Sequence, residues 1–122
     1  MKIRIKGNSV RLRLTKTEVE IFCKTGRFEE QTQFSNGPFI YALQAKDTIE
    51  KMEAIFKENK IEIAISKHLI TDWATNSKVG FQYVIPMTNK KELSLLIEKD
   101  FVCMDATVED QSDNYPNPKV GA

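Results

Sequence analysis

Residues 10–34, V-R-L-R-L-T-K-T-E-V-E-I-F-C-K-T-G-R-F-E-E-Q-T-Q-F, and residues 61–85, I-E-I-A-I-S-K-H-L-I-T-D-W-A-T-N-S-K-V-G-F-Q-Y-V-I, follow one pattern at an offset of 51 residues. Both begin with alternating apolar residues, continue with a hydroxyl residue (Thr15 or Ser66) and then carry apolar residues at helical spacing. The matched apolar pairs are Val10/Ile61, Leu12/Ile63, Leu14/Ile65, Val19/Ile70, Phe22/Trp73, Cys23/Ala74, Phe28/Val79 and Phe34/Ile85. One offset that aligns strands, cap and helix face indicates an internal duplication.

The first copy predicts a β-β-α-β-β unit. Residues 2–6 and 10–14 alternate with period two, which is typical of strands joined by a tight turn. Thr15 and Glu18 have the spacing of a capping box, so a short helix begins there and ends near Gly26. Residues 27–34 and 39–45 complete the unit as two further strands.

The second copy predicts the same order, so the expected fold class is α+β. Duplicated units at residues 1–45 and 52–99 form one domain, residues 1–101, as a mostly antiparallel, barrel-like sheet with two short helices. Closure of the barrel would remove edge strands; a β-sandwich is the alternative. An acidic, proline-containing tail follows at residues 102–122.

The expected core gathers the inward positions of these strands and helices. Its members are Ile3, Ile5, Val10, Leu12, Leu14, Val19, Phe22, Phe28, Tyr41, Leu43, Ile61, Ile63, Ile65, Ile70, Trp73, Val79, Phe81, Leu95 and Ile97. The opposite strand positions include several apolar residues, so helices, the tail or another copy of the chain in a homodimer is expected to cover part of that face.

Composition gives a broad class but names no partner. The 122 residues are 41% hydrophobic and 29% charged, with a net charge of +1, as in ordinary globular domains. No run approaches 18 apolar residues, so no membrane association is expected. The alternating N-terminus lacks the apolar run of a signal peptide, and Cys23 and Cys103 have neither disulfide-scaffold nor metal-site spacing. These features favour a cytoplasmic, bacterial protein.

Charge is segregated between the ends of the chain. Residues 1–16 contain no acid, and the basic strand residues are Lys2, Arg4, Lys6, Arg11 and Arg13. Residues 100–113 contain no base, and the tail carboxylates are Asp105, Glu109, Asp110 and Asp113. One interpretation is a clasp, in which at least one tail carboxylate pairs with Arg4, Arg11 or Arg13. A second is a site for an external anion, either nucleic acid or a small phosphate or carboxylate, and a third is a set of unpaired charges that water solvates.

Sequence motifs for catalysis are absent. There is no glycine-rich phosphate loop, metalloprotease motif or calcium loop, and neither a cofactor nor a metal site is expected. His68, the single histidine, is expected at the surface of the second helix. A binding or regulatory module that recognises an anionic group or a protein is therefore favoured, with an enzyme site near His68 or Cys103 as an alternative.

Two motifs near the chain ends resemble a family of small uncharacterised bacterial proteins, a domain of unknown function. They are K-I-R-I-K-G-N-S-V-R-L-R-L-T-K-T-E-V at residues 2–19, and E-K-D-F-V-C at residues 98–103 followed by E-D-Q-S-D-N-Y-P-N-P at residues 109–118. The resemblance spans nearly the whole chain and implies a stand-alone domain. It implies no activity, substrate or catalytic residue.

Overall fold

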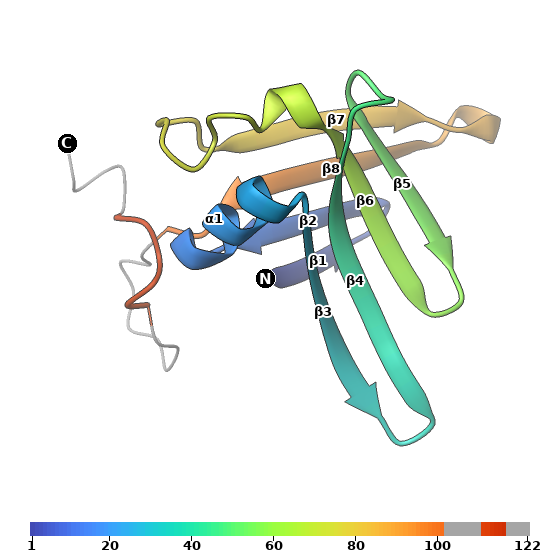
Figure 1. Ribbon diagram of the computed structural model, residues 1–122. Helices are drawn as coiled ribbons and strands as arrows, with labels where there is room; N and C mark the ends of the chain where they lie inside the picture. The colour runs from blue at the N-terminus through green and yellow to red at the C-terminus, as the bar shows by residue number, and fades with distance from the viewer. Residues whose placement is uncertain (102–110, 117–122) are drawn as a thin grey trace.

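Two four-stranded sheets and one α-helix form the part of the chain that the computed structural model describes, residues 1–101 and 111–116 (Figure 1). Sheet A has the order β1 (Lys2–Lys6), β2 (Ser9–Leu14), β8 (Glu92–Lys99) and β7 (Gly80–Pro86). Sheet B has the order β3 (Arg27–Phe34), β4 (Gly37–Lys46), β6 (Lys60–Ser66) and β5 (Met52–Lys57). The helix α1 (Lys16–Thr25) links β2 to β3, and the short 3-10 helices η1 (Lys67–Leu69) and η2 (Thr88–Lys90) precede and follow β7.

Each sheet joins one hairpin from each half of the chain. The hairpin pairs are antiparallel, whereas the central pairs, β2 with β8 and β4 with β6, are parallel. The described sheets are therefore mixed, with four antiparallel and two parallel strand pairs. The predicted barrel is wrong, because no ladder joins the two sheets and β1, β7, β3 and β5 remain as edges of the described sheets. The arrangement has the two sheets of the predicted alternative, a β-sandwich.

The register of sheet B repeats the register of sheet A. Ile3 is opposite Leu12 in sheet A, and Ala54 is opposite Ile63 in sheet B, which preserves the offset of 51. The later strands shift: Phe28 is opposite Leu43, and its counterpart opposite Ile97 is Phe81.

The offset at β3 and β7 is therefore 53 residues rather than 51, so the predicted match of Phe28 with Val79 is wrong. Val79 was expected in the core, but it is 46% exposed, whereas Phe81 is buried. The two residues that separate the offsets lie in the connection between β6 and β7, outside the repeating strands.

The helix α1 begins and ends where its sequence predicts. Thr15 Oγ1 and the Glu18 carboxylate complete the capping box, and Gly26 adopts the left-handed conformation that stops the helix. The second predicted helix is wrong as an α-helix, since only the single turn η1 forms. Ser66 makes no cap hydrogen bond there, and Leu69 stands where Glu18 closes the first capping box.

The core lies between the sheets and is closed at one end by α1 and the segment after β6. Ile5, predicted in the core, is instead 55% exposed near the tip of the β1–β2 hairpin, because this end lies away from α1 (Figure 1). No helix in the described ranges is long and apolar enough to span a bilayer. The largest fully buried side chains are Trp73, Phe22, Leu12, Leu14, Leu43, Ile63, Ile65, Leu95 and Ile97.

Candidate functional site

The outer side of the β1–β2 hairpin carries five basic residues, here called the basic face: Lys2, Arg4, Lys6, Arg11 and Arg13. Alternation along each strand turns the intervening apolar residues toward the core. The antiparallel register places Lys2 opposite Arg13 and Arg4 opposite Arg11. Like charges thus stand directly across from each other twice, an arrangement that is locally unfavourable.

Acidic residues neutralise only part of this face. Glu98 on β8 lies opposite Arg13 in the ladder. Its Oε1 is 2.8 Å from Arg13 Nε and 3.6 Å from Arg11 Nε, so one carboxylate serves two guanidinium groups. Lys2 Nζ lies 3.0 Å from Asp100 Oδ2. Arg4 and Lys6 form no ion pair with the described residues, so the face keeps a positive surplus.

The basic face is open rather than pocketed. Its depression has a volume of about 150 Å³ and is lined by Lys2, Ile3, Arg4, Arg11 and Arg13. Sites that enclose small organic ligands usually exceed about 300 Å³. The outward positions of the described sheet A carry no aromatic side chain for stacking, so charge and guanidinium hydrogen bonds are what this face offers a ligand.

The described part of the tail, residues 111–116, contacts the start of α1, and its Asp113 forms no ion pair with Arg4, Arg11 or Arg13. The Asp113 carbonyl accepts from Lys16 N at 2.9 Å, and its carboxylate accepts from Thr17 Oγ1 at 2.9 Å. Hydrogen bonds from the Thr15 and then the Thr17 hydroxyls lower the pKa of Asp113. Asp113 therefore adds a negative charge to the helix N-terminus. The other predicted tail residues, Asp105, Glu109 and Asp110, lie outside the described residues.

Tyr115 anchors the same tail segment beside a buried lysine. Tyr115 N donates to the Asp100 carbonyl at 2.8 Å, and burial raises the pKa of Tyr115 to about 12. Lys99 Nζ lies 5.0 Å from the centre of the Tyr115 ring and donates to the Asn76 carbonyl at 2.7 Å. Burial lowers the pKa of Lys99. The alternation of β8 gives the signal for this position, because Lys99 continues the inward series of Leu95 and Ile97.

Of the two residues proposed to mark an enzyme site, the structure describes the surroundings of His68. His68 Nδ1 is 3.0 Å from Ser66 Oγ, but Ser66 is fully buried and so is closed to a substrate. No carboxylate within residues 1–101 and 111–116 forms a hydrogen bond or an ion pair with His68. Burial raises the pKa of the Cys23 thiol, whose Sγ lies 3.4 Å from the Ile70 carbonyl. Cys103 lies outside the described residues.

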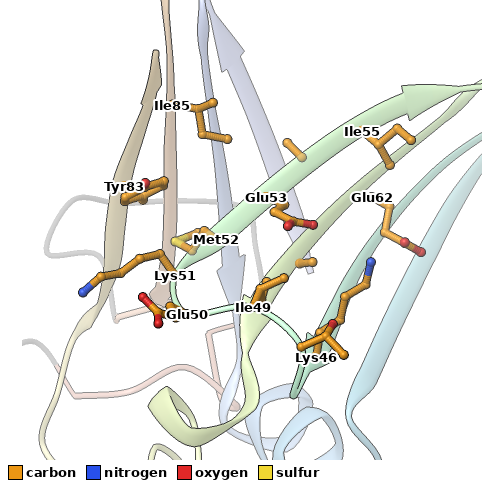
Figure 2. A pocket seen from close by; sticks show the side chains of 13 residues that line it. Lys46, Ile49, Glu50, Lys51, Met52, Glu53, Ile55, Glu62, Tyr83 and Ile85 are labelled. Carbon is orange, nitrogen blue, oxygen red and sulfur yellow. The ribbon is translucent and has the colours of Figure 1, made fainter. Parts of the chain in front are cut away.

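A groove that the sequence did not reveal runs along β5. Its volume is about 690 Å³, and β5 and the connection before it form most of its walls (Figure 2). Lys46 at the end of β4, Glu62 and Ala64 of β6, and Tyr83 and Ile85 of β7 complete them. The first half of the chain supplies no counterpart of the connection at residues 47–51, so the repeat pattern carries no signal for this groove. Across residues 1–101 and 111–116, no three His, Cys, Asp or Glu side chains gather to hold a metal ion.

Comparison with known proteins gives one match. A family model with the description "Family of unknown function (DUF7009)" matches residues 1–119. No curated protein and no solved structure matches the chain.

Proposed function

Because the chain belongs to the DUF7009 family, whose description names no activity, we propose a function from its own residues: it is a non-catalytic binding module that holds a nucleic-acid phosphate backbone on the basic face. Arg4 and Arg11 carry this proposal. They stand directly opposite each other on an exposed sheet surface, and Glu98 contacts Arg11 only at 3.6 Å. A bound phosphate would relieve their mutual repulsion and accept hydrogen bonds from both guanidinium groups.

The shape of the face favours a polymer over a small anion. A small phosphate or carboxylate ligand is best held by an enclosing pocket, and the depression at the basic face is shallow and small. Alternate residues of a strand stand about 6.8 Å apart on one face, so the five cations form an extended surface rather than one point. Without outward aromatic rings, such a surface binds phosphates with little dependence on base sequence.

We also propose that the chain arose by duplication, with units at residues 1–45 and 52–99 in one domain. The repeated register of the two sheets supports this origin. On this account β1 and β5 are counterparts that diverged: β1 became basic, whereas β5 kept the mixed sequence M-E-A-I-F-K. A cytoplasmic site of action in bacteria, where nucleic acid is accessible, remains a prediction of this account.

The test is a matched pair of charge-removing variants. Arg4→Ser/Arg11→Ser is expected to weaken binding of a labelled random-sequence DNA duplex by about tenfold at low salt, because two phosphate contacts are lost. Lys24→Ser/Lys67→Ser removes the same charge from α1 and η1 and is expected to leave binding within about twofold. Fluorescence anisotropy measures both. Equal loss in the two variants, or no binding by the native protein, contradicts the proposal; preference for single-stranded RNA or for heparin would redefine the polymer.

A further inference from the structure

β5 has a free side that is ready to accept another strand. β5 pairs only with β6 in the described sheet. Ser66 N donates to the Lys51 carbonyl at 2.8 Å, which makes this a hydrogen-bonded pair of the antiparallel ladder. Such pairs alternate, so the odd-numbered residues of β5 face β6. The N–H and carbonyl groups of Met52, Ala54 and Phe56 therefore point to the free side, where no described residue pairs with them.

Several side chains of β5 also lack apolar contacts or ion-pair partners within the described part of the molecule. Ile55 is 58% exposed and Phe56 is 70% exposed, the two most exposed large hydrophobic residues of the described chain. Glu53 and Lys57 flank Ile55 on the same face, and neither forms an ion pair with the described residues. Lys57 even stands opposite another cation, Lys60, in the ladder with β6. Apolar area and both charges on this strand thus lack partners.

We infer that β5 is the interface of a homodimer, in which β5 of a second copy adds antiparallel to it about a twofold axis at Ile55. In this register Ile55 meets Ile55 of the partner subunit. Glu53 stands opposite Lys57 of the partner subunit, and symmetry repeats that ion pair. Ala54 stands opposite Phe56 of the partner subunit, and both residues direct their backbone groups across the interface, as a hydrogen-bonded pair requires. In this one register the backbone groups point across the interface, opposite charges face each other, and the two Ile55 side chains are in contact.

The groove beside β5 offers a place for Phe56 of the partner subunit. That ring would lie on the sheet face shared with Ala54, whose small side chain leaves room for it. Ala54, Tyr83 and Ile85 line the same groove, with Tyr83 and Ile85 on the side opposite β5 (Figure 2). The far end of the β5–β6 hairpin extends away from sheet A (Figure 1), so a second hairpin can approach the edge around Ile55.

The counterpart strand β1 cannot pair with itself in this way. The equivalent register would place Arg4 opposite Arg4 and Lys2 opposite Lys6 of a second copy. Like charges directly opposite each other disfavour strand pairing, and charged edges protect sheets from self-association. The two equivalent edges thus differ: β1 repels a second copy of itself, and β5 is complementary to one.

Sedimentation equilibrium of the full chain tests the dimer. The native protein is expected to have about twice its chain mass of 14.0 kDa. Ile55→Lys places two ammonium groups at the twofold axis and is expected to give a monomer with an unchanged circular dichroism spectrum. Ile21→Lys, on α1 at a residue 41% exposed, is the matched control and is expected to remain a dimer. A native monomer, or a dimer that survives Ile55→Lys, overturns the inference.

A charge exchange tests the register itself. Glu53→Lys and Lys57→Glu each place like charges opposite each other at two symmetric positions, so each is expected to raise the dimer dissociation constant by about five- to tenfold. The double variant Glu53→Lys/Lys57→Glu restores opposite charges and is expected to recover the native dissociation constant. Additive weakening in the double variant would show that these residues do not face each other, and would exclude this register.

Discussion

Arg4 and Arg11 show how alternation along a strand concentrates charge at the scale of single residues. Their neighbours Ile3 and Leu12 face the core. Because side chains alternate along a strand, the two guanidinium groups lie together on the outer side of the hairpin. Each like-charged pair directly across two strands usually destabilises a sheet by roughly 0.2–1 kcal/mol. This unfavourable pair lies on an open surface, and it is the observation at this scale that most favours the proposed anion site.

Asp113 gives a prediction about pH at the same scale. Its pKa is lowered in the folded protein, so its contribution to stability is present above the pKa of the unfolded chain and is lost as pH falls through the folded pKa. Asp113→Asn is expected to reduce the free energy of unfolding by about 0.3–1 kcal/mol at pH 7, the usual value of a charge at a helix N-terminus. Thermal unfolding at pH 7 and at acid pH measures this.

The acid-pH arm is the control for that variant. Once Asp113 is protonated in both states, the native protein and Asp113→Asn are expected to unfold at nearly the same temperature. A difference that stays constant across pH would mean that Asp113 acts through its shape and not through its charge.

At the scale of helices and strands, the sequence predicts the local elements but not the pairing of strands between the two halves of the chain. The strand of residues 27–34 and the capped helix before Gly26 were predicted correctly, because alternation and capping chemistry are local properties. The joining of β2 to β8 was not predicted, since strand pairing between the two halves is decided by the core. Val79 was misplaced because the connection after β6 shifts the offset by two residues. Since side chains alternate along a strand with a period of two, a shift of two residues leaves the apolar pattern unchanged.

Gly80 at the start of β7 is an element-scale test of the β7–β8 pair. A Cβ atom at this position would lie 2.1 Å from the Ile97 carbonyl oxygen and 2.8 Å from Glu98 Cα. Since both are backbone atoms, Gly80→Ala must displace a strand and is expected to cost about 1–3 kcal/mol of stability. Urea unfolding measures the loss.

Gly7→Ala is the companion variant, because a Cβ atom at Gly7 meets nothing within 4 Å and only the positive φ of 55° opposes it. We expect Gly7→Ala to lose less stability than Gly80→Ala. The reverse order would indicate that β7 does not approach β8 as closely as described.

At the scale of the whole molecule, the two sheets differ in how the charges on their outer faces are paired. Among the described residues, Arg4 and Lys6 of the basic face have no ion-pair partner. On the outer face of sheet B the charges of β3 and β6 pair internally, with Arg27 contacting both Glu29 and Glu62, whereas Glu53 and Lys57 of β5 do not. The hairpin that carries the five cations forms as the alternation predicted, and the role of the basic face as an anion site stays a prediction. It could not predict the groove at β5, because Tyr83 and Ile85 reach it only through the crossing of the two sheets.

The acidic tail is expected to compete with nucleic acid for the basic face. Asp105→Asn/Glu109→Gln/Asp110→Asn removes three negative charges and leaves Asp113 and Tyr115, which hold the tail at α1 and Asp100, unchanged. The triple variant is expected to bind duplex DNA more tightly, by about threefold to tenfold at low salt, since an internal competitor is weakened. Unchanged affinity would contradict the competition and leave the tail with a structural role alone.

The salt dependence of duplex binding tests the central claim most directly. If the surplus cations of the basic face contact phosphates, the logarithm of the association constant falls linearly with the logarithm of salt concentration. We expect a slope of about −3 for the native protein and about −1 for Arg4→Ser/Arg11→Ser, because each phosphate contact contributes about −0.9. A native slope near zero, or one that the double substitution leaves unchanged, would contradict the assignment of this face as the nucleic-acid site.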